Sequence, residues 1–422
     1  MNRHAALCCA LVGSLAIGFS IPASAQAPNI DKLKQMKVSG TDLNIPPVLQ
    51  TGPNATAIRE NLKRVKLPPG FKIDLYAIVP DARHMAVAPS TNMLFVGTRK
   101  TTVWAVTDRN SDGVADEVKA FAPSLKFSVP NGVCWTRDGF LIVVDHNRVL
   151  NFPAAEFFYE GPDVAVIEVV PQGKLIPVEE ESYNHGARTC RVGKDGMLYI
   201  TLGQPFNVQP REKLKIFDEF GIGGIVRMNA FDGSKREVYA RGIRNSVGFD
   251  WHPETRQLWF TDNGRDMLGD DAPPDELNTA PKAGLHFGYP YCHGGDLPDP
   301  DFGGKRACSE FVGPEKKLNA HVAALGMRFY TGSMFPLEYK NAVFIAEHGS
   351  WNRSKKSGYR LMVAKVEGGK VVDHKVFADG FLDVGADSAW GRPVDVLQMP
   401  DGSLLVSDDH ANAIYRITYS AK

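Results

Sequence analysis

One strand–turn–strand pattern recurs along the chain and restricts the folds that it can adopt. Each copy has a short apolar segment, a turn rich in Asp, Gly, Pro or Asn, and a second segment of branched and aromatic residues. The six copies are RHMAVAPSTNMLFVGT from Arg83, PNGVCWTRDGFLIVVD from Pro130, HGARTCRVGKDGMLYITLG from His185, RNSVGFDWHPETRQLWFTDNG from Arg244, FPLEYKNAVFIAEHG from Phe335 and RPVDVLQMPDGSLLVSDD from Arg392. The copies start roughly every 50–60 residues, apart from one longer gap that an insertion over residues 265–327 fills.

Repeats of this length, with little helical periodicity after residue 70, are typical of four-stranded propeller blades. We therefore expect an all-β fold, a six-bladed β-propeller over residues 67–422. An N-terminal arm over residues 26–66 is expected to pack on its outside. The strand-like segment GFKIDLYAIV, from Gly70, is expected to close the last blade.

The first 25 residues have the pattern of a secretory signal peptide. Arg3 and His4 precede an apolar run from Ala5 to Phe19, and Ala23-Ser24-Ala25 is a typical cleavage site. The alternative, a retained membrane anchor, is disfavoured because the run is too short to cross a bilayer, and no later segment is long enough. We expect a periplasmic or secreted protein that does not span the membrane.

Four cysteines follow the predicted signal peptide, and an oxidising compartment permits disulfides. Cys292 and Cys308 bracket a loop rich in Gly, Pro and Asp, so we predict that they pair. Cys134 and Cys190 lie at strand starts, where we interpret them as buried thiols without establishing whether they pair. The 48 Lys and Arg residues are balanced by 48 Asp and Glu residues, and the sequence has no basic stripe. This balance argues against a nucleic-acid partner.

The predicted inner strands begin with polar and cationic residues. In a propeller these strands run in one direction along a central channel, so their first residues meet at one mouth. Those positions hold His84, Asn131, His185, Arg244 with Asn245, and Arg392. Each of them could form a salt bridge of its own, but unpaired like charges that converge on one channel repel each other. The pattern therefore predicts an anionic ligand at the mouth.

The chain resembles the pyrroloquinoline quinone (PQQ)-dependent soluble glucose and sorbosone dehydrogenases, and is most similar to the sorbosone dehydrogenase branch. The segments that carry the resemblance are NHGARTCRVGKDGMLYITLG, RGIRNSVGFDWHP, TDNGRDMLGDDAPPDELN, GLHFGYPYCHGG, AEHGSWNR and GRPVDVLQMPDGSLLVSDD. The resemblance implies that PQQ, a tricarboxylate, lies over the channel. It also implies oxidation of an aldose, sorbosone or a related sugar or alcohol by hydride transfer to the quinone.

The resemblance assigns roles to residues at the mouth. His185, ten residues before the turn residue Asp195, matches the family's general base, and a histidine suits that role because it titrates near neutral pH. Arg244, Asn245 and Arg392 match residues that hold the cofactor, and cations stabilise the negative charge of its reduced form. Without the resemblance, His185 would be interpreted as a histidine hydrogen-bonded at a strand end.

On the fifth blade the family has a cofactor-binding lysine. The segment EHGSWNRSKK offers Arg353, Lys355 and Lys356 in its place, of which we favour Arg353, with Trp351 stacking on the flat ring system. Two other positions depart from the glucose-oxidising members, because Val247 and Val394 stand where those proteins carry a glutamine and a second arginine.

The resemblance also implies Ca²⁺. The family holds it with backbone carbonyl groups after a strand, which here places it at Gly264 and Arg265. Asp275 and Glu276 match a carboxylate-rich segment that follows in the family.

A separate segment, DRNSDGVADE, carries Asp108, Asn110 and Asp112 at the spacing of half a calcium loop. It lacks the distal glutamate, so an Asp-rich turn fits the sequence equally well.

Two other functions remain open. A propeller lactonase would polarise a lactone with a channel calcium held by Asn131, Asn245 and Asp395, although the excess of cations argues against it. A non-catalytic propeller that binds glycans or proteins would not need both His185 and the Arg-Asn pair. For a dehydrogenase, the expected partners are a small sugar substrate and an electron acceptor such as a cytochrome or a quinone.

Overall fold

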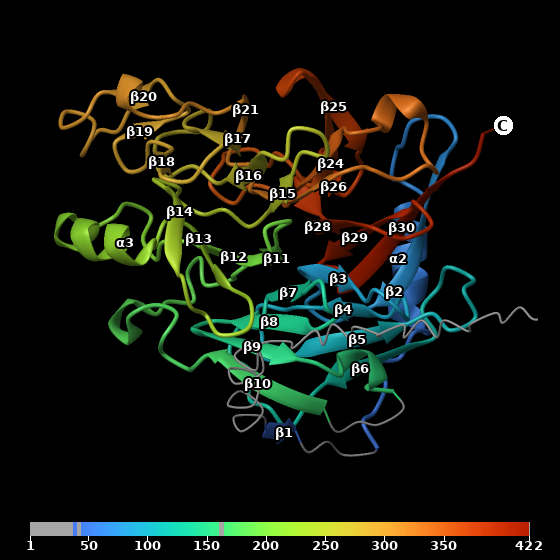
Figure 1. The fold of residues 1–422 in the computed structure, drawn as a ribbon. Helices are drawn as coiled ribbons and strands as arrows, with labels where there is room; N and C mark the ends of the chain where they lie inside the picture. Colours follow the sequence, from blue (N-terminus) through green and yellow to red (C-terminus); the bar gives the residue numbers. More distant parts are fainter. Residues whose placement is uncertain (1–36, 40–43, 160–163, 422) are drawn as a thin grey trace, which may run out of the picture.

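The computed structural model describes residues 37–39, 44–159 and 164–421, and the predicted signal peptide falls outside them. Six antiparallel four-stranded units form the blades of a β-propeller, so the predicted all-β, six-bladed fold is confirmed (Figure 1). The inner strands are β3 (Met85–Val87), β7 (Gly132–Trp135), β11 (Cys190–Val192), β15 (Phe249–Trp251), β22 (Ala324–Phe329) and β28 (Pro393–Gln398).

The remaining strands of each blade follow outward from the inner strand. The second strands are β4 (Leu94–Val96), β8 (Leu141–Asp145), β12 (Met197–Leu202), β16 (Leu258–Asp262), β23 (Val343–Glu347) and β29 (Leu404–Asp408). The third strands are β5 (Val103–Thr107), β9 (Arg148–Phe152), β13 (Gly224–Asn229), β17 (Pro274–Ala280), β24 (Arg360–Glu367) and β30 (Ala413–Tyr419). The outer strands are β6 (Glu117–Phe121), β10 (Val164–Val170), β14 (Glu237–Arg241), β21 (Lys316–Ala320), β25 (Lys370–Ala378) and β2 (Phe71–Ile78).

The sixth blade joins the two ends of the propeller. Its outer strand β2 comes from the N-terminal side and pairs antiparallel with β30, from Phe71 opposite Tyr419 to Ile78 opposite Ala413. The expectation that the segment from Gly70 closes the last blade is therefore confirmed. Backbone hydrogen bonds between distant parts of the chain therefore close the ring, and the sixth blade packs against the first.

Segments before β2 pack on the outside of the blades. Helix α2 (Pro53–Leu62) buries Ile58 and Leu62 in the same hydrophobic cluster as Leu75 of β2. The short strand β1 (Lys37–Ser39) adds to the outer edge of the second blade by pairing with β10. Within the described ranges, no helix is long and apolar enough to cross a membrane.

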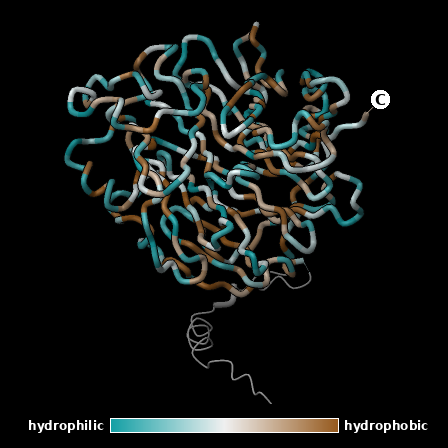
Figure 2. Tube along the Cα trace, turned by 45° about the horizontal axis from the view of Figure 1, so that its top comes forward, coloured by the Kyte–Doolittle hydropathy of each residue, from teal (hydrophilic) through white to brown (hydrophobic). Residues whose placement is uncertain are grey.

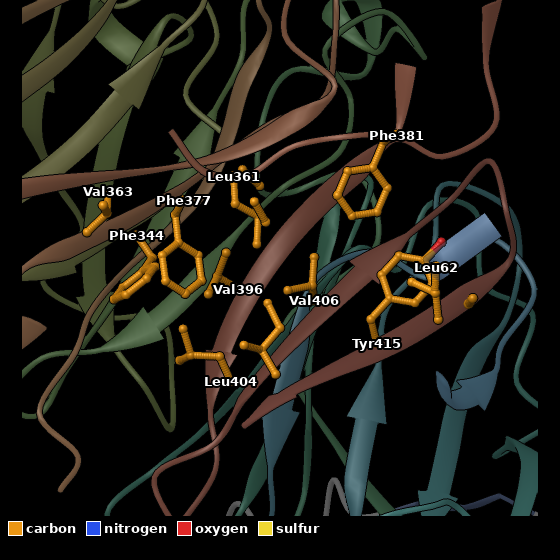
Figure 3. Close-up of a cluster of buried hydrophobic side chains, with 14 of the residues drawn as sticks. Leu62, Phe344, Leu361, Val363, Phe377, Phe381, Val396, Leu404, Val406 and Tyr415 are labelled. Carbon is orange, nitrogen blue, oxygen red and sulfur yellow. The ribbon is translucent and has the colours of Figure 1, made fainter. Parts of the chain in front are cut away.

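The core consists of side chains packed between neighbouring blades. Figure 3 shows Phe344, Leu361 and Phe377 of the fifth blade beside Val396 and Leu404 of the sixth. In Figure 2, hydrophobic stretches (brown) run through the interior of the molecule, and hydrophilic stretches (teal) occupy many peripheral loops. Each blade buries both of its faces against its neighbours, which is why the strands are rich in branched and aromatic residues.

The fifth copy of the sequence pattern was placed too far along the chain. The segment from Phe335 contains a short 3₁₀ turn, Leu337–Tyr339, and then the second strand β23. The inner strand is β22, which lies upstream and within the segment interpreted as part of the insertion. The connection between β22 and β23 is longer than the tight turns of the other blades, so the pattern did not reveal the first strand.

Both pairs of cysteines form disulfides. The predicted pairing of Cys292 with Cys308 is confirmed, and it closes the loop between β17 and β21 of the fourth blade. The interpretation of Cys134 and Cys190 as buried thiols is wrong, because they form a disulfide with their Cα atoms 5.9 Å apart. They occupy the inner strands β7 and β11 of adjacent blades, which pack against each other.

The segment with half a calcium-loop pattern is an Asp-rich turn. Carboxylate oxygens of Asp108 accept the backbone N–H groups of Asp112 and Gly113, and Asn110 also accepts that of Asp112. The oxygens that a cation would need are therefore engaged with the turn's own backbone.

Candidate active site

A cavity of about 570 Å³ opens at the mouth of the channel where the inner strands begin. It is lined by residues that precede inner strands and by residues that follow second strands. Inner and second strands are antiparallel, so the start of one lies beside the end of the other. The sequence-predicted residues that line it are His185, Arg244, Asn245, Trp351 and Arg392. The ring-mouth geometry thus brings together five of the predicted site residues from blades three to six.

His185 presents one free ring nitrogen to this cavity. Its Nδ1 lies 2.6 Å from the backbone carbonyl oxygen of Gln204, so the neutral ring donates its Nδ1 proton to that oxygen. The lone pair then lies on Nε2, which makes no hydrogen bond with any described residue. Burial and the guanidinium groups of Arg244 and Arg188 lower the pKa of His185 from 6.5 to about 4. His185 is therefore a neutral base at physiological pH.

Arg188, three residues after His185, supports the backbone of this segment. It does not line the cavity but lies buried beneath it, where Nη1 donates to the carbonyl oxygens of His185 at 3.1 Å and Gly203 at 3.3 Å. Its Nε donates to the carbonyl oxygen of His146 at 3.3 Å. His185 has a φ of 52°, in the left-handed region that non-glycine residues rarely adopt. Arg188 therefore holds the backbone of the segment that carries His185 in this conformation.

Arg244 and Asn245 are fixed through their backbone. The buried carboxylate of Asp262, at the end of β16, accepts the N–H of Arg244 at 3.0 Å and that of Asn245 at 2.8 Å. The Arg244 guanidinium pairs with Asp266 at 2.8 Å and also donates to Asn207. The Oδ1 atom of Asn245 is buried and has no hydrogen-bond partner among the described residues. This oxygen can accept a hydrogen bond from a ligand in the cavity.

Arg392 and Trp351 also face the cavity, but Arg353 does not. Among the described residues, the guanidinium of Arg392 donates only to the carbonyl oxygens of His348 and Gly349, at 3.3 and 3.4 Å. Trp351 has 67% of its surface exposed at the rim. Arg353 instead donates to the carbonyl oxygen of Asp270 and pairs with Asp271 at 3.1 Å, so it ties two loops together outside the cavity. The structure therefore does not support Arg353 as a cofactor ligand.

The predicted mouth ring was misplaced by one residue on the first blade. His84 is only 4% exposed, accepts the N–H of Val133 on Nδ1 and lines a different cavity. Its neighbour Arg83 faces the mouth instead, and Asn131 lies buried next to it, accepting a hydrogen bond from the Arg83 Nε at 3.1 Å. Side chains alternate along an extended segment, so a shift of one residue reverses the direction that they face.

Two arginines at the mouth, Arg83 and Arg99, were not predicted from the sequence. Arg83 begins the first repeat and its guanidinium pairs with Asp409, while Arg99 follows the second strand of the same blade. Antiparallel pairing places the ends of second strands beside the starts of inner strands, so residues at both positions line the cavity. His348 lines the cavity for the same reason, and it donates to Asp409 at 2.8 Å.

The carboxylates proposed to bind calcium are occupied by the protein itself. The two oxygens of Asp275 accept the N–H groups of Gly264 at 2.9 Å and Ala324 at 3.3 Å. Those of Glu276 accept the N–H of Gly294 at 2.7 Å and the amide of Asn278 at 3.0 Å. Both side chains are buried, and neither lines the cavity. They fit the backbone, and they do not fit a calcium site.

Arg265 points its charge elsewhere as well, in an ion pair with Asp299 at 2.6 Å. The described part of the chain holds no cluster of three or more His, Cys, Asp or Glu side chains that could bind a metal ion. Only the backbone carbonyl groups of Gly264 and Arg265 remain of the predicted set. The side-chain cage of the lactonase alternative is absent too, because neither Asn131 nor Asp395 lines the cavity with Asn245.

The floor of the cavity is apolar. Val247, Leu325 and Val394 form one small buried cluster, and the first two line the cavity. The two positions that depart from the glucose-oxidising proteins, 247 and 394, are therefore in contact with the same apolar group. A polar side chain at either position would be buried next to aliphatic neighbours.

These features define a six-bladed propeller with a cationic cavity and a neutral histidine at the channel mouth. The chain belongs to the glucose/sorbosone dehydrogenase family, whose sequence model matches residues 174–416. An uncharacterized protein of Borreliella burgdorferi is 33% identical over 371 residues, which cover 86% of this chain and 93% of that protein. This membership supports sugar dehydrogenase activity as the general class of function, and hence an oxidoreductase.

Two further similarities concern characterised proteins. The aldose sugar dehydrogenase YliI of Escherichia coli is 29% identical over 243 residues, which cover 54% of this chain and 58% of that enzyme. The holo form of the PQQ domain of a pyranose dehydrogenase from Coprinopsis cinerea has the same fold, with a TM-score of 0.66 and 18% identity. That match covers 84% of this chain and 97% of the domain.

Proposed function

We propose that the protein is a PQQ-dependent sugar dehydrogenase in which His185 is the general base. The observation that carries this proposal is a neutral histidine whose free nitrogen faces a cavity lined by four arginines, Arg83, Arg99, Arg244 and Arg392. PQQ carries three carboxylates on a flat ring, so a cationic cavity of this size suits it. The family membership and the similarity to an aldose sugar dehydrogenase support the same reaction class.

The cavity residues fit this cofactor by their chemistry. Arg244 and Arg392 supply charged donors from blades four and six, and Asn245 has a buried oxygen without a partner among the described residues. Trp351 offers an exposed indole at the rim, where it can cover a flat ring. When bound, PQQ supplies a quinone that accepts the hydride from the substrate.

His185 removes the proton of the substrate hydroxyl while the hydrogen on the same carbon leaves as a hydride. The carbonyl oxygen of Gln204 keeps the ring in the tautomer with a free Nε2, so no rearrangement is needed before proton transfer. The proton is held on Nε2 and then released to solvent, while the sugar carbon becomes a carbonyl. The nearby guanidinium groups stabilise the negative charge that develops during hydride transfer.

We propose Ca²⁺ as a second cofactor, which the backbone carbonyl groups of Gly264 and Arg265 would hold. Chelation of the reconstituted protein tests whether the activity requires it. We also propose export to the periplasm or the exterior, in line with the two disulfides and the N-terminal signal pattern. The electron acceptor is then a cytochrome or a quinone of that compartment.

The test is reconstitution of the purified protein. Dialysed protein is titrated with PQQ and calcium, and aldoses, sorbosone and simple polyols are added while the absorbance of the quinone is followed. We expect reduction that needs both PQQ and a sugar. Sugar oxidation by the dialysed protein without PQQ, or the absence of PQQ binding, would contradict the proposal.

A further inference from the structure

The four arginines that line the cavity are not equally neutralised. Arg244 pairs with Asp266, and Arg83 pairs with Asp409. Within the described ranges, the guanidinium of Arg392 donates only to neutral carbonyl groups. The guanidinium of Arg99 makes no hydrogen bond or ion pair with any residue in the described ranges, although Arg99 lines the same cavity. Two of the four cations therefore lack a carboxylate partner within the described part of the chain.

Three of these arginines lie on one side of the cavity. Arg83 precedes β3 and Arg99 follows β4, both in the first blade, and Arg392 precedes β28 in the sixth. The inner strands β3 and β28 are neighbours in the closed ring. Proximity of Arg83, then burial and the charge of Arg392, lowers the pKa of Arg99, as expected for like charges close together.

The carboxylates near this group are already engaged. Asp409 is shared between Arg83 and His348. Asp81 accepts the backbone N–H groups of Arg99 and Lys100, so it shapes the loop and leaves the Arg99 guanidinium free. Of the residues that line the cavity, only Asp266 carries a carboxylate, and it lies with Arg244 on the fourth blade. The blade 1–blade 6 side of the cavity keeps an excess of positive charge.

The floor of the cavity is apolar, so it does not balance this excess of positive charge. Where the glucose-oxidising proteins carry a second arginine close to the position of Arg392, this chain has Val394, packed against Val247 and Leu325. His185 and Asn245 belong to blades three and four, which lie across the six-membered ring from the junction of blades six and one.

We propose that Arg99, together with Arg83 and Arg392, forms a carboxylate-binding subsite at the junction of the first and sixth blades. This inference rests on the proposed function, since it takes PQQ as the ligand. These three residues would hold one carboxylate of the cofactor, on the side of the cavity opposite His185. Arg99 supplies a charged donor that no ion pair engages among the described residues.

Calorimetric titration of PQQ into the full-length protein tests this subsite. Arg99→Ala is expected to weaken PQQ binding by about tenfold or more, because a charge-assisted hydrogen bond is lost. Arg99→Lys should recover part of the affinity, and Arg99→Glu should lose more than Arg99→Ala. The losses should shrink as salt is raised, since this side chain is accessible to ions. Lys100→Ala is the matched control, as Lys100 is an exposed neighbouring cation that does not line the cavity.

The outcomes separate the two proposals. If wild-type protein binds PQQ and Arg99→Ala binds it within twofold of wild type, the subsite is wrong and the proposed function survives. If wild-type protein does not bind PQQ, the proposed function itself is wrong. Arg99→Ala should melt at the wild-type temperature, because its side chain has no partner in the described structure to lose. A lower melting temperature with equal weakening in Lys100→Ala would assign the effect to the loop and overturn the subsite.

Discussion

The Nδ1 atom of His185 lies 2.6 Å from the carbonyl oxygen of Gln204, and this contact leaves Nε2 as the acceptor that faces the cavity. The contact orients the ring by the same means that orients catalytic histidines elsewhere, a hydrogen bond to the nitrogen that does not react. The proposed chemistry therefore depends on His185.

His185→Gln should bind PQQ with near-normal affinity and reduce it about 10²–10⁴ times more slowly, the usual contribution of a positioned base. The affinity should persist because glutamine fills a similar volume and carries no charge. Stopped-flow reduction by the best sugar, normalised to bound PQQ, measures the effect. If His185 only held the strand in place, the variant would show a lower melting temperature and a rate within threefold of wild type.

The titration of His185 should lie well below neutrality in the cofactor-free protein. Burial and the charges of Arg244 and Arg188 lower its pKa to about 4, so the ring stays neutral at pH 6. Between the unfolded value of 6.5 and about 4, the unfolded chain binds a proton that the folded chain does not, so this group destabilises the fold as pH falls through that window. NMR of the ring proton should show a midpoint near 4, and Arg244→Gln should raise it. A wild-type midpoint near 6.5 would contradict the structure.

Gly203→Ala should damage the site. A Cβ at this position would lie 2.5 Å from the Asn245 Oδ1 and 2.7 Å from the Cβ of His185, too close for either side chain to stay in place. We expect about 1–3 kcal/mol of destabilisation from overpacking and a marked loss of PQQ reduction. Gly304→Ala is the control, because a Cβ there would meet no atom within 4 Å. Equal behaviour of the two variants in thermal melting and stopped-flow assays would show that the close approach of Gly203 to Asn245 and His185 is not required.

Loss of the Cys134–Cys190 disulfide should affect both stability and rate. It closes a sequence separation of 56 residues, against 16 for Cys292–Cys308, so the chain-entropy relation gives about 4 and about 3 kcal/mol, respectively. Only the first clamps β11, which begins five residues after His185. The Cys134→Ala/Cys190→Ala protein should therefore unfold at lower denaturant concentration and reduce PQQ more slowly. The Cys292→Ala/Cys308→Ala protein should keep its rate per bound PQQ, and a matching loss of rate there would refute the special role of β11.

Several features followed from the sequence alone. Strand–turn–strand repeats determined the propeller, because each copy forms one local unit whose apolar faces need neighbouring blades. The strand from Gly70 and the pairing of Cys292 with Cys308 also followed, since both depend on short segments with clear patterns. The positions of His185, Arg244, Asn245 and Arg392 could be placed at the mouth because each lies shortly before an inner strand.

Other features were decided only by the tertiary structure. Arg83 rather than His84 faces the mouth, Arg99 joins it from the end of a second strand, and Arg353 lies outside it. Cys134 meets Cys190 across two blades, and Asp275 is bound by backbone N–H groups of Gly264 and Ala324. The sequence pattern places each segment within its own blade, whereas these contacts join segments that lie far apart in the chain. The packing of blades against each other decides which segments meet, and the alternation of side chains along each strand decides which residues face the mouth. The spacing of residues along the chain does not predict either.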